Sequence, residues 1–358
     1  MPTLTEPMAT TTRSAKTAFV TGANGYIGSA VCRAFVRAGW RVYGLVRRPE
    51  AASVLAAEEV TPIIGSISKD ATFLDDLYKH TKTVDVIVSC TEQLPFGEHF
   101  EALVVLFREL ASTSNQNGVR PLVIASSGCK DYGVTGVHGS PGLLPHTEES
   151  PLQPVDIVRE RALDSLKIFT HTDLFDATLV RPTPVFGYDS SYYGLMFEVA
   201  SAAAKTEERT LRLSQNFNTI LHGCHIDDCA EAYLALAEHA DRAAVAGQCF
   251  NISAHKYDTL SSIAKALEVE YGLNGGVVGI SPADATSAGS SLDLVLGYTQ
   301  WVDSTKIRRL TGWTDGRMLL SENLHVYRMA YEEAAKRGHE GVLRIKERMS
   351  GILSSVKI

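Results

Sequence analysis

An apolar run that ends in closely spaced glycines and continues into a helical pattern constrains this chain more than any other feature. The run lies in "KTAFVTGANG", and "YIGSAVCRAFVRAG" follows with apolar residues at helical spacing and Gly39 as a stop signal. Four more strand-like runs follow in the first third of the chain, "WRVYGLVRR", "VTPIIGS", "VDVIVSC" and "RPLVIASS", with helical patterns between them. Strands alternating with helices predict an α/β fold with a doubly wound parallel sheet, because right-handed crossovers connect parallel strands of one sheet.

The glycines of this turn are spaced as in a dinucleotide site. Gly22, Gly25 and Gly28 form Gly-x-x-Gly-x-x-Gly between a strand and a helix. Glycine permits the tight turn, the close approach of backbone to a pyrophosphate and the close packing of the helix on the sheet. The N–H groups at the positive end of the helix then hold the phosphates. We expect cofactor contacts from Gly22, Gly25, Tyr26, Ile27 and Gly28.

The end of the second strand indicates which dinucleotide binds. A site for an unphosphorylated ribose usually places a carboxylate there, but this strand ends in "LVRRPE", with Arg47 and Arg48 at that position. A guanidinium cannot accept a hydrogen bond from a hydroxyl, whereas it donates paired, charge-assisted bonds to a 2′-phosphate. Glu50 lies beyond a proline and too far along to serve. The residues favour NADP(H); the alternative is a solvated basic strand end.

Composition limits the other classes of function. With 358 residues, 45% of them hydrophobic, the chain can bury one large core with a smaller annex. A net charge of −7 argues against nucleic acid or an acidic membrane as partner, and no apolar run reaches the roughly 18 residues of a membrane span. The six cysteines are scattered without a Cys-x-x-Cys, which predicts reduced thiols in a cytoplasmic protein and indicates no metal site.

Further segments, in order along the chain, carry a family resemblance. They are "TGANGYIGS", "LVIASSGCKDYG", "LVRPTPVFG", "GCHIDDCAEAYLALAE", "GQCFNIS" and "VDSTKIRRLTGW". From about Lys16 to Tyr331 the chain resembles the extended short-chain dehydrogenase/reductase family, of the NAD(P)-dependent epimerase/dehydratase type. This resemblance implies a Rossmann cofactor domain over residues 16–187, to which segments 218–253 return. Residues 188–358 then form mainly a substrate-binding region, and residues 1–15 are expected to be a disordered lead-in.

The resemblance also implies which side chains surround the site. Further cofactor contacts are expected near the ends of later strands, at Ser66, Ile67, Ser89, Cys90, Arg161, Pro182, Thr183 and Val185. Substrate contacts are expected at Glu92, Gly128, Cys129, Lys130, Tyr188, Tyr192 and Tyr193. The three tyrosines can equally be packing or surface aromatics of a loop. Asp227 and Asp228 precede a helical run and are expected to cap it, rather than to bind a metal.

The usual catalytic residues of the family are replaced in this chain. The family uses Tyr-x-x-x-Lys with a Ser or Thr partner, in which the tyrosine exchanges the proton and the lysine holds the ribose. The lead-in "TEESPLQP" places Ile157 at the tyrosine and Arg161 at the lysine, and Gly128 stands at the Ser or Thr position. No tyrosine occurs between Gly133 and Gly187, so a small shift of register does not restore the motif.

Lys130 is the most capable chemical group near these positions. An ammonium beside a carbonyl can stabilise an oxyanion, or serve as acid or base when desolvated. Ser127 and Arg161 are the other catalytic candidates, and Asp131 is either a partner of Lys130 or a turn residue. The alternative for Lys130 is an exposed loop lysine, and loop histidines nearby are expected to be solvated: His99, His138 and His146.

Three functions remain open from the sequence. The first is an NADPH-dependent oxidoreductase that acts on a small organic molecule with non-standard catalytic residues. The second is a non-redox isomerase, cyclase or lyase on the same scaffold, and the third is a non-catalytic NADP(H)-binding regulator. The resemblance also implies a homodimer, paired through the helices of "EALVVLFREL" and "VRERALDSLKIF".

Overall fold

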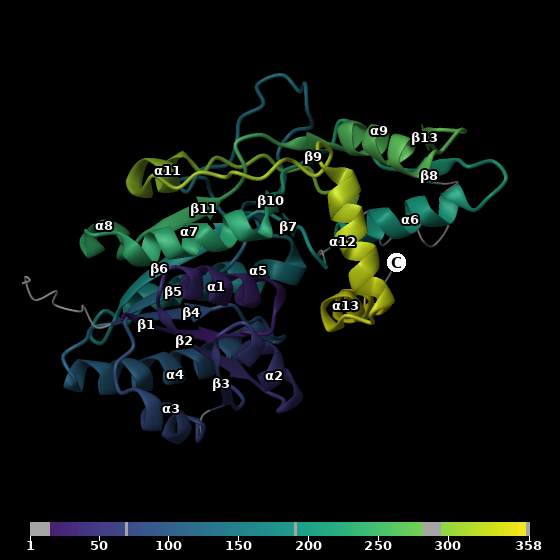
Figure 1. The fold of residues 1–358 in the computed structure, drawn as a ribbon. Helices are drawn as coiled ribbons and strands as arrows, with labels where there is room; N and C mark the ends of the chain where they lie inside the picture. The colour runs from purple at the N-terminus through teal and green to yellow at the C-terminus, as the bar shows by residue number, and fades with distance from the viewer. Residues whose placement is uncertain (1–14, 69–70, 190–191, 282–294, 356–358) are drawn as a thin grey trace, which may run out of the picture.

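The computed structural model describes residues 15–68, 71–189, 192–281 and 295–355, with the side chains of the last segment described to residue 347. Its centre is a seven-stranded parallel sheet in the order β11-β6-β5-β4-β1-β2-β3 (Figure 1). The strands are β1 (Thr17–Thr21), β2 (Arg41–Val46), β3 (Thr61–Ile64), β4 (Val86–Ser89), β5 (Leu122–Ser126), β6 (Asp176–Pro182) and β11 (Cys249–Ile252). The predicted α/β fold with a doubly wound parallel sheet is confirmed. Of the predicted lead-in, all but Ala15 lies outside the described residues.

Helices cover both faces of this sheet, which is why its central strands are mainly apolar, with polar residues at their ends. On one face α1 (Tyr26–Arg37) packs against α7 (Ile226–Glu238), with α11 (Thr305–Thr311) beside them. On the other face lie α3 (Leu74–His80), the 21-residue α4 (Phe96–Gln116), α5 (Asp156–Asp164) and the 3₁₀ segment η2 (Ser165–Thr170). The short helices α2 (Glu50–Ala57) and α8 (Arg242–Val245) and the 3₁₀ turn η1 (Cys129–Tyr132) complete this half. Each face therefore has its own hydrophobic core.

A second, smaller unit with its own core follows the sheet. It contains α6 (Gly194–Ala204), α9 (Leu260–Tyr271) and α12 (Leu324–Lys336), whose buried side chains pack together. Short strand pairs lie outside the central sheet: β7 (Val185–Phe186) with β10 (Cys224–His225), β9 (Ile220–Leu221) with β12 (Asp258–Thr259), and β8 (Leu211–Leu213) with β13 (Val277–Gly279). The β8–β13 pair is part of the second unit, since its apolar residues pack in that core. The last helix, α13 (Glu340–Ser355), follows α12 and turns back beside it (Figure 1). No helix in the described part of the chain is both long and apolar enough to cross a membrane.

The chain reaches the sheet again after leaving it. Segment 218–253 supplies α7 to one face and β11 to the edge beside β6. The carboxyl ends of β1, β2, β4, β5 and β6 lie at the edge of the sheet that faces the second unit: Tyr26, after β1, donates to the carbonyl oxygen of Gly187, where the chain enters that unit. Ligands of parallel α/β sheets bind at this edge, so the two halves together frame the candidate site.

Candidate functional site

The glycine turn after β1 is built as a phosphate-binding loop. Gly22 has φ +66°, and the N–H of Gly25 donates to its carbonyl oxygen at 2.8 Å. A Cβ on Gly28 would lie 2.1 Å from that same oxygen, so a larger residue there would force the loop open. Helix α1 begins at Tyr26 with no side-chain cap and no acidic residue in its first turn. These backbone N–H groups therefore fit a dinucleotide pyrophosphate.

The ends of the neighbouring strands bring the other expected cofactor residues to this edge. Arg47 and Arg48 follow directly after β2 and are exposed, and Arg48 forms an ion pair with Glu340 of α13. After β3, Ser66 is exposed and Ile67 half-buried, while Ser89 is buried at the end of β4 with Cys90 next to it. Pro182, Thr183 and Val185 are buried where β6 passes into β7. The N–H of Thr183 donates to Ile252 of β11 at 2.8 Å, which holds this segment against the sheet.

A fully buried carboxylate, that of Asp131 in η1, organises the centre of the site. One oxygen accepts from Arg161 Nη2 of α5 at 2.8 Å. The other accepts from Ser127 Oγ at 2.5 Å and from Arg181 Nε of β6 at 3.3 Å. Arg161 also pairs with Glu92 at 3.5 Å. The partners of Asp131 are thus two arginines and a serine, and the sequence had left its role open.

The three replaced catalytic positions lie together in the structure. Ile157 is in the first turn of α5 with its side chain 47% exposed, and Arg161 follows one turn later on the same helical face. A Cβ on Gly128 would lie 3.2 Å from Arg161 Nη2, so the guanidinium takes the space that a serine side chain at 128 would enter. Gly128 and Arg161 are therefore in close contact, and a serine at 128 would require a small shift of the guanidinium.

Lys130 is held in a partly buried position above an aromatic ring. Its Nζ lies 4.3 Å from the ring centroid of Tyr298, whose hydroxyl donates to the carbonyl oxygen of Lys130 at 3.2 Å. Burial, and after it repulsion from Arg161, lowers the pKa of Lys130 to about 8. Gln300 Nε2 donates to the carbonyl oxygens of Cys129 and Gly133, which holds η1 in place. Sequence reasoning missed Tyr298 and Gln300, because no motif marks them.

The three candidate tyrosines are placed in three different surroundings. Tyr193 is 3% exposed and packs in the core of the second unit. Tyr188 has φ +50° and donates to Asp227 Oδ2 at 2.5 Å. Tyr192 lies close enough to Arg161 to act on its pKa. Tyr192 is therefore the one of the three beside the Asp131 cluster, and substrate contact by any of them remains a prediction.

Tyr188 and Asp227 line a separate pocket of about 390 Å³ between the start of α7 and α12. The expectation that Asp227 and Asp228 cap α7 is wrong. The cap is His225, whose Nδ1 accepts from the N–H of Asp227 at 3.2 Å. Burial lowers the pKa of His225, which favours the neutral ring that this hydrogen bond requires. Asp228 instead accepts from Arg317 and from the backbone of Gly316.

The three histidines considered from the sequence all have neighbours that hold them, and the expectation that they are solvated is wrong for His99. His99 is buried and hydrogen-bonded to Thr91, and burial lowers its pKa. His138 is exposed and bonded to Tyr257, and His146 stacks on the ring of Tyr132. Within the described ranges no group of three or more metal-binding side chains comes together.

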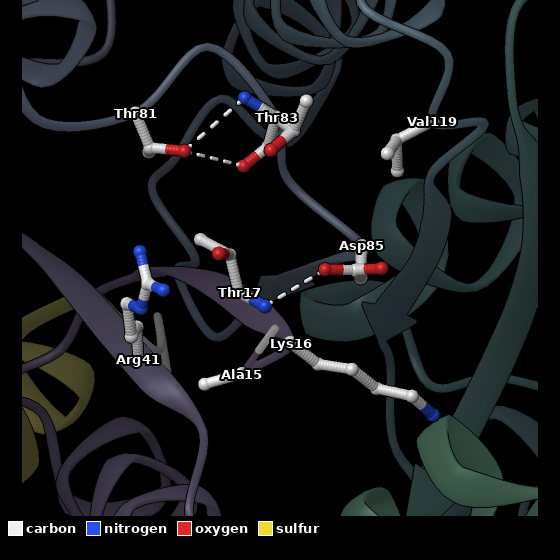
Figure 2. Close-up of a pocket in the computed structure, with 8 residues that line it drawn as sticks. All are labelled: Ala15, Lys16, Thr17, Arg41, Thr81, Thr83, Asp85 and Val119. Atoms are coloured by element: carbon white, nitrogen blue, oxygen red, sulfur yellow. Dashed lines mark hydrogen bonds between the residues drawn. The ribbon is translucent and has the colours of Figure 1, made fainter. Parts of the chain in front are cut away.

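A hollow of about 250 Å³ lies at the other edge of the sheet. Figure 2 shows its lining by Ala15, Lys16, Thr17, Arg41, Thr81, Thr83, Asp85 and Val119. Asp85 accepts from the N–H of Thr17 at 2.8 Å, and the Thr81 hydroxyl is bonded to the backbone of Thr83 (Figure 2). This hollow is at the amino ends of β1 and β2, away from the edge where parallel sheets bind ligands. It is no part of the candidate site.

The fold and the glycine loop define a Rossmann-type dinucleotide-binding protein. Residues 18–253 match the model of the NAD dependent epimerase/dehydratase family, and the chain belongs to this family. It is therefore an enzyme of the epimerase/dehydratase group, and the resemblance to extended short-chain dehydrogenases/reductases is confirmed.

Similar proteins cover most of the chain. An uncharacterized protein of Schizosaccharomyces pombe is 26% identical over 313 residues, which are 86% of this chain and 97% of that protein. UDP-glucose 4-epimerase 2 of Oryza sativa subsp. japonica is 25% identical over 288 residues, 71% of this chain and 69% of that one. The structure of dTDP-glucose 4,6-dehydratase from Bacillus anthracis in complex with NAD matches with a TM-score of 0.68 at 17% identity, covering 90% of this chain and 98% of that chain.

Replacing Asp131 by asparagine tests the buried network. The change leaves Arg181 without its counter-charge and Arg161 with Glu92 alone, so we expect the free energy of unfolding to fall by about 3–5 kcal/mol. Urea unfolding followed by circular dichroism measures this. The matched control is Asp173→Asn, which removes the exposed partner of Arg108 and should change the midpoint little. Equal midpoints for the two variants would contradict the assignment.

Proposed function

We propose that this chain is an NADP(H)-dependent oxidoreductase that acts on a small organic substrate, with Lys130 in place of the usual tyrosine as proton donor. The observation that carries the proposal is the position of Lys130 at the carboxyl edge, beside Arg161 and above Tyr298, with a pKa lowered to about 8. Bound NADPH would supply the hydride. The residues of the chain would bind it, orient the substrate and deliver the proton.

The cofactor part of the proposal rests on the end of β2. Arg47 and Arg48 are exposed there, next to the glycine loop, since the N–H of Ala23 donates to Leu45 at 3.4 Å. Two guanidinium groups at the end of the second strand support a 2′-phosphate there, because this strand end lies beside the adenosine ribose in Rossmann sites. The dehydratase neighbour binds NAD, so the preference of this chain would differ from that of its neighbour.

Lys130 is proposed as the proton donor because its pKa lies near neutral pH. Reduction of a carbonyl leaves an alkoxide that needs a proton, and general acids work best when their pKa is near the working pH. A lysine with a pKa of about 8 is mostly protonated at neutral pH and can still release its proton. Ile157 at the tyrosine position carries no proton. Arg161 is held by Asp131 and Glu92, and so it positions neighbouring groups rather than exchanging a proton.

The relatives suggest the substrate to test first. The rice relative is named a UDP-glucose epimerase, and the bacterial neighbour a dTDP-glucose dehydratase. We therefore place nucleotide sugars first in a panel that also holds simple carbonyl compounds. Ile157 favours, as a second candidate, a non-redox isomerase, cyclase or lyase. Product formation in the absence of NADPH would favour this second function, and binding of NADPH with no turnover at all would favour a regulator.

Assembly as a homodimer is part of the proposal, but on a smaller surface than the sequence suggested. Leu103, Leu106, Phe107 and Leu110 of α4 pack in the core of this chain and are not available to a partner. The apolar side chains that remain exposed on the two helices are Val105, Ile157 and Leu163. Light scattering at micromolar concentration should give twice the chain mass of 38.8 kDa, and a mass of one chain would end this part of the proposal.

Calorimetric titration tests the cofactor. We expect NADPH to bind more tightly than NADH, and the double variant Arg47→Ala, Arg48→Ala to lose most of that preference. Charged hydrogen bonds contribute about 1.5–3 kcal/mol each, so the loss should be of that order. Arg41→Ala is the matched control, because Arg41 is an exposed arginine at the opposite end of the same strand. Equal affinities of the unmodified protein for both cofactors would refute the preference.

Lys130→Met tests the proton donor. With a substrate from the panel, turnover should fall about 10²–10⁴-fold, because a general acid contributes that much. NADPH affinity should stay nearly unchanged. In the unmodified protein the rate should fall as the pH rises through about 8, since the ammonium that donates the proton is then lost. Lys167→Met, an exposed lysine of η2, is the control. Full activity in Lys130→Met would leave Lys130 an ordinary loop lysine.

A further inference from the structure

The last helix, α13, reaches the dinucleotide edge from the far end of the chain. Its residue Arg344 donates from Nη2 to the carbonyl oxygen of Asn24 at 2.8 Å, and Asn24 lies in the glycine loop between Gly22 and Gly25. One turn earlier on the same face, Glu340 forms the ion pair with Arg48 after β2. The same helical face therefore touches the loop and the strand end that a dinucleotide would contact.

Several contacts fix α13 in this place. Val342 is 3% exposed and packs in the core of the second unit. His339, just before the helix, pairs with Asp189 at 3.2 Å, and Lys346 pairs with Glu198 of α6 at 2.7 Å. A Cβ on Gly341 would lie 2.1 Å from an Asp189 oxygen, which shows how closely the first turn approaches that loop. The helix is thus anchored on the substrate side and presents its charged face to the cofactor side.

Three arginines from two distant segments gather at this edge: Arg47 and Arg48 after β2, and Arg344 of α13. Burial lowers the pKa of Arg344; Asp189 opposes the shift, and repulsion from Arg48 and Arg47 adds to it. Like charges that repel in the free protein lose that penalty when an anion of two charges binds between them. In the structure Arg48 is paired with the carboxylate of Glu340. A phosphate offers a guanidinium the same arrangement of two acceptor oxygens.

We propose that α13 completes the dinucleotide site: Arg344 acts with Arg47 and Arg48 on the 2′-phosphate of the cofactor, and Glu340 holds Arg48 until the phosphate displaces it. This rests on the proposed preference for NADP(H). The specificity-determining residue Arg344 then lies in the last helix, outside both the glycine motif and the segment after β2. A carboxylate and a phosphate then compete for Arg48.

Calorimetry with NADPH and NADH on the full chain tests the proposal. Arg344→Ala should weaken NADPH about tenfold to a hundredfold, the loss of one charged hydrogen bond, and NADH by less than about threefold. Glu340→Gln should tighten NADPH by up to about fivefold, because a surface pair of that kind is weak but must be broken. Arg212→Ala is the matched control: it removes an exposed arginine of β8 that pairs with Glu208, outside the proposed site, and the ratio of the two affinities should not change.

Hydrogen exchange on the unmodified protein gives a second readout that needs no variant. NADPH should slow amide exchange in residues 340–347 more than NADH does. The inference is overturned if the protein prefers NADPH but Arg344→Ala retains that preference, or if NADPH and NADH protect α13 equally. If the unmodified protein shows no preference for NADPH, the cofactor proposal itself fails, and the role of Arg344 fails with it.

Discussion

The buried carboxylate of Asp131 is the interaction on which the arrangement of this site depends. It ties the turn after β5 to Arg181 of β6 and to Arg161 of α5, at the edge where the sheet opens. A buried charge is stable only with close counter-charges, so the three segments are obliged to meet at one point. The orientation of η1, and with it the position of Lys130, follows from that requirement. The chemistry proposed for Lys130 thus rests on a residue that itself exchanges no proton.

The same network accounts for the replaced catalytic positions as a set. An arginine at 161 reaches Asp131 and Glu92 with two nitrogens, which a lysine ammonium cannot do with the same planar geometry. The guanidinium then fills the space above Gly128. A serine at position 128 would need the guanidinium to shift by a few tenths of an ångström. A tyrosine at position 157 would therefore lack both of its usual partners, the serine and the lysine. Ile157, which stands there instead, is partly exposed to solvent.

The sequence predicted the sheet and the glycine loop because both are encoded by local pattern. Apolar runs of strand length and glycines at fixed spacing need only neighbouring residues to be read. The capping of α7 was predicted wrongly because it, too, was judged from local pattern: two aspartates at a helix start favour a cap. In the structure Asp228 binds Arg317, and the N-cap residue is His225. The family resemblance implied pairing through α4, yet most of the apolar side chains of this 21-residue helix are buried in the core of its own chain. Tyr298 and Arg344 carry no local signal, since only the folded chain brings them to the site.

The contact between Lys130 and Tyr298 spans 168 positions of the chain, and this separation has a consequence for folding. Contacts so far apart in sequence form late, after the loops between them have closed. A nascent chain that has emerged only as far as β7 holds the glycine loop and Lys130, but not the ring that covers the ammonium. Until the last third of the chain is in place, Lys130 stays hydrated and has the acidity of an ordinary lysine. The cofactor loop can thus be assembled early, whereas the acid–base group is tuned only when synthesis is nearly complete.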